Sequence, residues 1–511
     1  MGLMTPIEIV DVCAPREDAP LFIIGPYANR VNFVAQQTRA LNLVHALFAT
    51  SRLKPTDKVA VIGGGIAGVT AAIALVGYGA QVSIIESGAM LLPRQSETVH
   101  RIVNPSITRW PMERLSETTS LRFLDWYEMP CNEIAQLLRG EYEKVKAANP
   151  GALDHHPNRI ATLIEANPKT ISVEVADATF DSYRAVIVAL GFGTEDKGQS
   201  LGITESEWVG YWTPDNIVDT RNNYPNVRFI ISGAGDGGMI DMLRVVHRDF
   251  DRGRLPIRVA ALLEGTDLAA RIRSEEFASV KNMDAIKDLD TMYTEAAETI
   301  DTDPRYEAVR DLLTRSYLEK GPPRHYLVDK MLKHPVSPAG SPINKLLIYH
   351  AIKAEKVSFK HGELKLSATH IDVPMSASLE RVKCRLIVRH GPLVAFGNLI
   401  NKSDLKALDS KQRARADDLA IPIWNDQLKS PAPLPPLDPA SETYKLYRRD
   451  LATRYLSQLT RGNVQLEVTI DGYTAYGPLD ASMPDDVFGV PLVPGKPIIG
   501  GPIFSAMPGR P

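Results

Sequence analysis

Short apolar runs alternate with polar turns along the first half of the chain. The run Val59–Ile62 leads into a glycine-rich turn, then into the small-residue stretch Val69–Val76, and then into a second apolar run, Gln81–Ile85. Val59–Ile62 is fully apolar and Gln81–Ile85 mostly so, which is typical of buried parallel strands, and the stretch between them has the composition of a helix. The pattern predicts a β-α-β unit over residues 58–86.

Other patterns surround this unit. Apolar residues at helical spacing predict an amphipathic helix over Val34–Ser51, which we interpret as a packing element, and a second helix over Cys131–Ala148. Two alternating segments around a turn at residues 159–177, followed by the apolar run 185–193, predict a β-meander that returns to a parallel sheet.

A second glycine-rich segment lies further along the chain. Strand Val227–Ser232 precedes it, helix Met239–Phe250 follows it, and an apolar run, Ile257–Leu263, is predicted as a strand that ends at Glu264. The pattern predicts a second β-α-β unit of the same kind.

The second half of the chain is less regular. Residues 266–335 are charged and helical in pattern, and strands are predicted near 356–373 and 381–389. The proline-rich stretch Lys429–Ala440 predicts an extended linker, and a helix over Tyr444–Thr460 is expected beyond it.

These elements predict an α/β fold class: a parallel-sheet domain with a β-meander, a candidate second unit of the same kind, a helical insertion and a small C-terminal α+β appendage. We expect the parts to be an N-terminal extension (1–57), a region with the two glycine-rich units (58–265), a helical insertion with returning strands at the substrate or an interface (266–428), the linker (429–440) and the appendage (441–511).

The first glycine-rich turn has the spacing G-x-G-x-x-G. Gly63 permits the tight turn, Gly65 lets a diphosphate approach the backbone, and Gly68 lets helix and strand pack closely. Gly64, Ile66 and Ala67 complete the loop, whose amides and helix dipole face the phosphates. Glu86, at the end of the second strand, is suited to accept hydrogen bonds from ribose hydroxyls. Together these residues predict a site for an adenine dinucleotide.

Composition narrows the function classes. The chain has 511 residues, of which 44% are apolar and 23% charged, with a net charge of −3. This balance gives no reason to expect nucleic acid or a membrane as partner. The start of the chain lacks a basic region followed by an apolar core, so we expect a cytoplasmic protein.

The cysteines and histidines exclude some chemistry. The three cysteines, Cys13, Cys131 and Cys384, form no C-x-x-C pair and no zinc spacing. The adjacent His155 and His156 lack the spacing of metal ligands, and we expect no metal site.

The order of these motifs resembles FAD-dependent oxidoreductases of the glutathione-reductase, thioredoxin-reductase and flavin-monooxygenase type. The first glycine motif, Glu86, the meander and the turn Ala189-Leu190-Gly191 carry the resemblance, which covers about residues 58–265. It implies a Rossmann-type FAD-binding domain with FAD as cofactor, makes residues 58–265 an FAD/NAD(P)-binding region with a candidate second nucleotide-binding unit, and assigns Gly191 to the FAD site.

An Arg/Pro/Trp-rich loop after Glu86 supports FAD over NAD at the first site, because an NAD domain usually continues as regular β-α-β units. Such a loop can lie along the ribityl chain and ring of a longer cofactor. Arg94, Arg101 and Trp110 are the candidate catalytic residues, with Arg94 also a candidate flavin ligand and His100 a further candidate. The alternative for each is a surface ion pair or a packed aromatic.

The second glycine-rich segment has two interpretations. Gly233, Gly235 and Gly238 fit an NADH or NADPH site, for which Glu264 would accept ribose hydroxyls and favour NADH. Alternatively, Phe229–Asp236 resembles the closing strand of the FAD domain, and Asp236 would then contact the flavin.

The leading hypothesis is an FAD-dependent oxidoreductase that uses NAD(P)H and passes electrons to a small molecule or O2, as a reductase or monooxygenase. The absence of C-x-x-C argues against a disulfide reductase. Two alternatives remain: a substrate oxidase of the amine or amino-acid type without a nicotinamide site, and a flavin-binding sensor or assembly protein. The extensions at both ends would suit a protein partner or a homo-oligomer.

Overall fold

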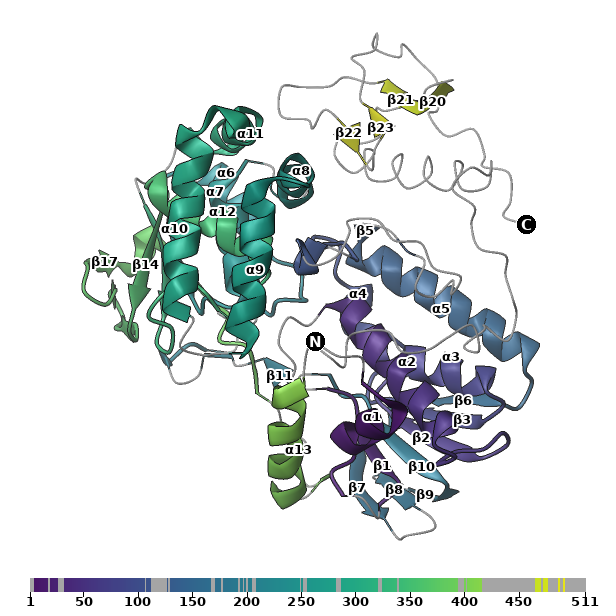
Figure 1. Cartoon of the computed structure of the whole chain (residues 1–511). Helices are drawn as coiled ribbons and strands as arrows, with labels where there is room; N and C mark the ends of the chain where they lie inside the picture. The colour runs from purple at the N-terminus through teal and green to yellow at the C-terminus, as the bar shows by residue number, and fades with distance from the viewer. Residues whose placement is uncertain are drawn as a thin grey trace, which may run out of the picture.

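The structure is a computed structural model of the whole chain. It describes residues 4–16, 19–25, 32–105, 107–111, 126, 129–166, 171–175, 178–191, 194–195, 197–198, 201–204, 208–248, 250, 255–281, 286–319, 324–337, 340–393, 399–400, 402–415 and four short strands beyond residue 464. Most of these residues form two α/β units that lie side by side (Figure 1).

The first unit is built on a parallel sheet of five strands in the order β1-β10-β2-β3-β6. The strands are β1 (Leu21–Ile23), β2 (Lys58–Ile62), β3 (Gln81–Ile85), β6 (Leu153–His156) and β10 (Ala185–Val188). The predicted β-α-β unit is confirmed: β2 pairs in parallel with β3 and the helix between them is α3 (Ile66–Gly77).

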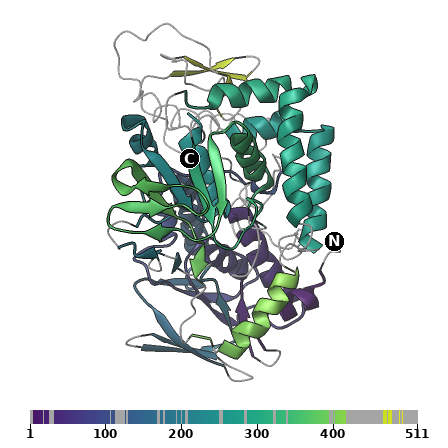
Figure 2. The ribbon, with the colours of Figure 1, turned by 90° about the vertical axis from the view of Figure 1, so that its left-hand side faces the viewer.

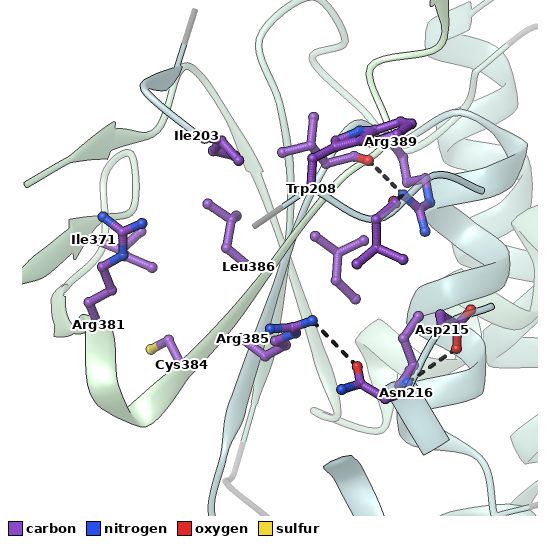
Figure 3. A pocket seen from close by; sticks show the side chains of 14 residues that line it. Ile203, Trp208, Asp215, Asn216, Ile371, Arg381, Cys384, Arg385, Leu386 and Arg389 are labelled. Atoms are coloured by element: carbon purple, nitrogen blue, oxygen red, sulfur yellow. Dashed lines mark hydrogen bonds between the residues drawn. The ribbon is translucent and has the colours of Figure 1, made fainter. Parts of the chain in front are cut away.

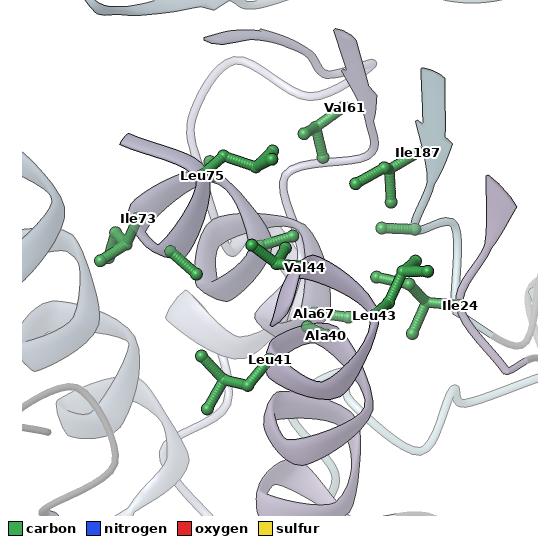
Figure 4. Close-up of a cluster of buried hydrophobic side chains, with 14 of the residues drawn as sticks. Ile24, Ala40, Leu41, Leu43, Val44, Val61, Ala67, Ile73, Leu75 and Ile187 are labelled. Atoms are coloured by element: carbon green, nitrogen blue, oxygen red, sulfur yellow. The ribbon is translucent and has the colours of Figure 1, made fainter. Parts of the chain in front are cut away.

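Successive side chains along these strands point to opposite faces of the sheet, and different elements cover the two faces. Val59 and Val61 face a cluster formed by α1 (Pro6–Cys13), α2 (Phe33–Ala49), α3 and α5 (Cys131–Ala148). Figure 4 shows Val44 of α2 with Ala67 of α3 in this cluster. The predicted helices over 34–51 and 131–148 correspond to α2 and α5.

Ala60 and Ile62 face the opposite side, where the predicted β-meander lies. It consists of β7 (Ala161–Ala166), β8 (Ile171–Val175) and β9 (Ala178–Tyr183), joined antiparallel. Helix α13 (Lys402–Arg415) covers the same side through Leu408, together with Leu399 and Ile400.

The N-terminal extension is part of the first unit. Strand β1 pairs in parallel with β10 and so forms one edge of the sheet. Helix α2 packs directly on α3 and is buried along most of its length. The expected boundary at residue 57 therefore falls inside a folded unit.

The second unit has a four-stranded parallel sheet in the order β14-β13-β12-β18. Its strands are β12 (Arg228–Ser232), β13 (His325–Asp329), β14 (Val357–His361) and β18 (Cys384–Val388). Helices α7 (Asp236–Val246) and α12 (Pro342–Lys353) pack on one face. The chain enters and leaves this unit through paired strands, β11 (Thr194–Glu195) and β19 (Pro392–Leu393).

Four helices separate α7 from β13. They are α8 (Leu255–Leu263), α9 (Asp267–Lys281), α10 (Ile286–Thr302) and α11 (Glu307–Ser316). The strand predicted over Ile257–Leu263 is wrong: this segment is α8, which buries Leu255, Val259 and Leu263 at helical spacing. The expected boundary at residue 265 thus falls within the second unit.

The other face of the second sheet is covered by a small antiparallel sheet of β15 (Lys365–Leu366), β16 (His370–Asp372) and β17 (Ser378–Glu380). Ile371 and Val373 pack there against Ile230 and Val328. Figure 2 shows these green strands and the teal helices on opposite sides of the unit.

The remaining elements are short. They are α4 (Pro93–Ser96), β4 (Ile102–Val103), η1 (Ile107–Arg109), β5 (Met129–Pro130), α6 (Ile217–Asn223), η4 (Pro304–Tyr306), η5 (Arg381–Lys383), β20 (Gln465–Thr469), β21 (Gly472–Tyr476), β22 (Asp486–Val487) and β23 (Val490–Pro491). The predicted linker 429–440 and helix 444–460 lie outside the described residues. Among the helices described, none is long and apolar enough to cross a membrane.

A buried ion pair joins the helices of the second unit and generates a prediction about stability. Lys345 Nζ of α12 lies 2.9 Å from Glu276 Oε1 of α9, both side chains are fully buried, and the Tyr293 hydroxyl donates to the same carboxylate. Lys345→Met leaves that carboxylate buried without its cation, so we expect the free energy of unfolding to fall by about 3–5 kcal/mol.

Urea denaturation measures this loss. Lys353→Met is the matched control, because Lys353 lies on the same helix but pairs with partly exposed carboxylates. It should cost less than about 1 kcal/mol. Equal losses in the two variants would contradict the role given to the buried pair.

Buried histidines predict a pH dependence for the second unit. Burial lowers the pKa of His247 from its ordinary 6.5 to about 3, and burial with nearby Arg228 lowers the pKa of His325 to about 4. His325 Nδ1 accepts from Phe229 N at 3.1 Å, so protonation would break that bond. The unfolded chain takes up protons below pH 6.5 while the folded chain does not.

The stability that these two neutral histidines contribute is therefore fully present above pH 6.5 and is lost as the pH drops toward 4. Thermal melting between pH 7.5 and 4 should show this fall, and it should be smaller in His325→Asn, which keeps an acceptor but does not titrate. A melting temperature that stays constant over this range would rule out the proposed linkage.

Candidate functional site

The first glycine-rich turn has the geometry of a diphosphate cradle. Gly63 has φ +103° and donates its N–H to Ile85 O at 2.8 Å. A Cβ on Gly68 would lie 1.9 Å from Gly63 O, so only glycine permits this close approach of helix and strand. A Cβ on Gly65 would meet nothing within 4 Å, and Gly65 begins α3 without a side-chain cap. The open space at an uncapped helix start fits a diphosphate.

Glu86 is held beside this cradle. Its Oε2 accepts from Gly64 N and its Oε1 from Gly88 N, both at 2.6 Å, and the residue is 7% exposed. The carboxylate therefore has a fixed position at the carboxyl end of β3, where a ribose would follow the diphosphate. Gly191, with φ +66°, ends the turn after the adjacent strand β10.

The second glycine-rich segment repeats this geometry. Gly233 has φ +109° and donates to Val328 O at 2.7 Å, and a Cβ on Gly238 would again lie 1.9 Å from Gly233 O. A Cβ on Gly235 meets nothing within 4 Å, and Gly235 begins α7 without a side-chain cap. The two turns therefore present the same kind of space at the start of a helix.

Asp329 occupies in the second unit the place that Glu86 has in the first. The strand registers pair Ser232 with Val328 as they pair Ile62 with Ile85, and the acidic residue follows in each case. Asp329 Oδ2 accepts from Ala234 N at 2.8 Å, as Glu86 accepts from Gly64 N. The apolar run before Asp329 is the sequence signal that could have identified this residue. Four helices separate that run from the glycine turn, so the two do not appear as one motif in the sequence.

The role expected for Glu264 is wrong. It follows α8, a helix, and accepts from Trp110 Nε1 at 3.3 Å. The strand beside the second glycine turn is β13, and the residue at its end is Asp329, not Glu264.

The closing-strand interpretation of Phe229–Asp236 is also contradicted. Strand β12 pairs with β13 and β18 in the second sheet, whereas the strand beside β10 is β1. Asp236 Oδ1 accepts from Ser341 N, Ser341 Oγ and Asn344 Nδ2, each at 2.9 Å. These bonds give Asp236 the role of joining α7 to the start of α12.

The three candidate catalytic residues have different surroundings. Trp110 is fully buried in the core of the second unit, so the packed-aromatic alternative describes it. Arg101 is 2% exposed and forms ion pairs with Asp241 and Asp215, which makes it a structural cation. Arg94, on α4, lines a cavity.

Arg101 belongs to a buried ionic cluster between the units. The cations are Arg101, Arg244 and Arg389, and the anions are Asp215 and Asp241, with His100 Nε2 3.0 Å from Asp215. Burial disfavours the charged form of Asp241, but Arg101 and Arg389 hold its pKa at about 2. The cluster therefore stays ionised at neutral pH and ties the loop after α4 to α7 and β18.

Two cavities lie near this cluster. One, of about 170 Å³, follows β18, and Figure 3 shows Arg385 hydrogen-bonded to Asn216 along its wall. The other, of about 240 Å³, lies between α4 and residues 208–213 and is lined by Arg94 and Trp212. Trp208 lines both.

The cysteines do not form a redox pair. Cys13 and Cys131 are buried, and all three cysteines of the chain are unbridged. Burial raises the pKa of the Cys13 thiol to about 12, the opposite of what a reactive thiolate needs. In the described part of the chain, no group of three or more His, Cys, Asp or Glu residues is placed to hold a metal ion.

Part of the chain is similar to known proteins. Residues 32–109 and 57–236 match the family described as pyridine nucleotide-disulphide oxidoreductase. The chain is also 26% identical over 208 residues to 2,6-dihydroxypyridine 3-monooxygenase of Paenarthrobacter nicotinovorans, covering 36% of this chain and 50% of that protein. The chain thus spans half the length of the curated relative it matches.

Solved structures with a similar arrangement include two reductases. The bacillithiol disulfide reductase Bdr (YpdA) from Staphylococcus aureus has 11% identity and a TM-score of 0.38, covering 70% of this chain and 80% of that one. The thioredoxin reductase of T. acidophilum has 12% identity and a TM-score of 0.33, covering 71% and 97%.

The family match confirms the resemblance to flavin-dependent oxidoreductases, the Rossmann-type α/β fold class and the cofactor class of FAD with NAD(P)H. The match covers residues 32–236 of this chain, which hold the first unit and the start of the second. Its glycine turns fit these cofactors, because each leaves open space at an uncapped helix start beside a fixed carboxylate.

Gly65→Val tests the first cradle. A side chain at this position occupies the space of the diphosphate, so we expect FAD content to fall at least tenfold. The fold should persist, because a Cβ there meets no protein atom within 4 Å. Absorbance of the purified protein near 450 nm and circular dichroism measure the two effects.

Gly140→Val is the matched control, since a Cβ at Gly140 on α5 also meets nothing within 4 Å. It should retain full flavin content. Full FAD occupancy in Gly65→Val would defeat the assignment of this turn.

Proposed function

We propose that the protein is an FAD-dependent oxidoreductase that takes electrons from NADH and delivers them to a small-molecule acceptor other than a disulfide. The observation that carries this proposal is the repeated cradle, one in each unit, with Glu86 beside the first and Asp329 beside the second. Two dinucleotides bound in this way are what electron transfer from NADH to FAD requires.

The first unit is the better FAD site. The segment after Glu86 leaves the sheet and forms α4, whose preceding residue Leu92 donates to Gly64 O at 2.9 Å. The chain thus runs from the diphosphate cradle toward the second unit, which is the course a cofactor longer than NAD needs. FAD supplies the hydride-accepting chemistry when bound.

The second unit is suited to NADH. The Asp329 carboxylate can accept bonds from both hydroxyls of a ribose, whereas it would repel the 2′-phosphate of NADPH. Asp236, on α7, is engaged by α12 and contributes to the shape of the cradle.

The residues between the cradles hold the units in one arrangement. Arg101, from the loop after α4, pairs with Asp241 of α7 and donates through Nε to Tyr211 O at 3.2 Å. Burial of these charges excludes water from the junction and strengthens their attraction. The chain therefore aligns donor and acceptor without a dithiol.

A monooxygenase is the second candidate. The relative from Paenarthrobacter nicotinovorans favours it, because its printed activity is the oxygenation of a dihydroxypyridine. An oxidase without a nicotinamide site is less well supported, since the second cradle has the form of a nucleotide site.

Asp329→Asn tests the nicotinamide site. Loss of a charged hydrogen-bond acceptor costs about 1.5–3 kcal/mol, so the Kd for NADH should rise roughly 10- to 100-fold. The preference for NADH over NADPH should shrink as well, because the repulsion is removed. Anaerobic titration of the FAD-loaded protein, followed at 450 nm, gives both values.

Asp219→Asn, at an exposed position on α6, is the control and should titrate like the unaltered protein. If neither NADH nor NADPH bleaches the flavin of the unaltered protein, the proposed function is wrong. Equal affinities in Asp329→Asn and the control would remove Asp329 from the site.

A further inference from the structure

The cavity beside α4 lies between the two cradles. Leu92, which precedes α4, is bonded to Gly64 of the first cradle. On the other side, a Cβ on Gly237 would lie 3.2 Å from the ring of Tyr211, so the segment that forms the cavity wall also touches the second cradle. A molecule in this cavity would lie close to the ends of both proposed cofactor sites. The cavity is lined by Arg94, Glu97, Glu195, Lys197, Trp208, Gly210, Trp212 and Thr213.

The wall formed by residues 208–213 is held in place by hydrogen bonds. Thr98 Oγ1 donates to Trp212 O, and Arg101 Nε donates to Tyr211 O at 3.2 Å. Tyr211 N donates to Glu195 Oε2 at 2.7 Å. These bonds fix the backbone on both sides of the Trp212 side chain, so the cavity is preformed.

Aromatic contacts also fix the Trp212 ring. It stacks on Phe33 of α2 with centroids 5.8 Å apart at 30°, and it meets Tyr211 edge-on at 4.9 Å. Trp208, the second indole of the cavity, has Lys197 Nζ 5.7 Å from its ring centroid. Rigid indoles offer flat apolar surface for stacking at low entropic cost.

Charged groups of both signs border these rings. Arg94 and Glu97 come from the region of α4, and Glu195 and Lys197 come from the facing segment. A flat ring bound against either indole would have hydrogen-bond donors and acceptors within the same cavity. This arrangement matches a planar molecule that carries polar substituents.

We propose that this cavity binds the electron acceptor, a planar aromatic molecule with polar substituents such as a quinone, and that Trp212 and Trp208 determine its specificity. The proposal rests on the proposed function. The overall reaction is NADH + H⁺ + quinone → NAD⁺ + hydroquinone, in which two electrons and one proton come from NADH and the second proton comes from solvent.

Trp212→Leu is the test, with 1,4-naphthoquinone as the planar acceptor and ferricyanide as an acceptor that needs no stacking. Loss of one stacking surface costs about 1–3 kcal/mol, so the KM for naphthoquinone should rise roughly 5- to 150-fold. Ferricyanide-coupled oxidation of NADH and anaerobic reduction by NADH should stay unchanged. Trp212→Phe, which keeps a ring, should restore most of the affinity.

Calorimetric titration of the oxidised, FAD-loaded protein with naphthoquinone measures binding without turnover and should show the same loss in Trp212→Leu. Tyr224→Leu, which removes an exposed aromatic residue outside the cavity, is the matched control. An unaltered Kd and KM in Trp212→Leu overturn the proposal. A loss of FAD affinity in that variant also overturns it, because the indole would then contact the flavin ring.

These outcomes are separate from failure of the proposed function. If the unaltered protein does not oxidise NADH with ferricyanide as acceptor, the proposed function fails. The calorimetric titration still decides in that case whether the cavity binds a planar ring.

Discussion

The arrangement of the molecule depends on a set of charges buried where the two units meet. Arg101 leaves the first unit and ends against Asp241 on α7, where Arg244 and Arg389 also converge. Charges this deeply buried are stable only in close pairs, because an unpaired member would pay the full cost of leaving water. Since the partners come from both units, the relative position of the two cradles is tightly constrained. The proposed electron transfer between the two cofactors depends on that constraint.

The two units have the same arrangement of residues at their glycine turns. Each brings a glycine turn, an acidic strand end and the carboxyl end of a neighbouring strand to one edge of a parallel sheet. The units differ in what covers the sheet: a meander and α13 in the first, a small antiparallel sheet in the second. Because the site depends on the strand ends, large changes on the faces leave it intact.

Much of the first unit could be predicted from sequence, because its signals are local. The apolar run before Gly63 and the spacing to Glu86 sufficed for the strand, the turn and the acid. In the second unit the acidic residue could not be predicted in this way, because four helices separate the glycine turn from Asp329. The apolar run 257–263 then resembled the missing strand, although its buried residues have helical spacing. The clustering of Arg101 with Asp241 was also beyond local patterns, since it depends on how the units pack.

The order of the strands has a consequence for biosynthesis. The second unit takes Trp110 from the earlier chain and builds the rest of its core from residues between β11 and β19, so this core can form before the chain beyond β19 leaves the ribosome. The first unit is discontinuous, because Leu399, Ile400 and Leu408 of the later chain cover a face of its sheet. A nascent chain that has already made both cradles therefore still exposes apolar side chains of β2 and β10 until α13 emerges.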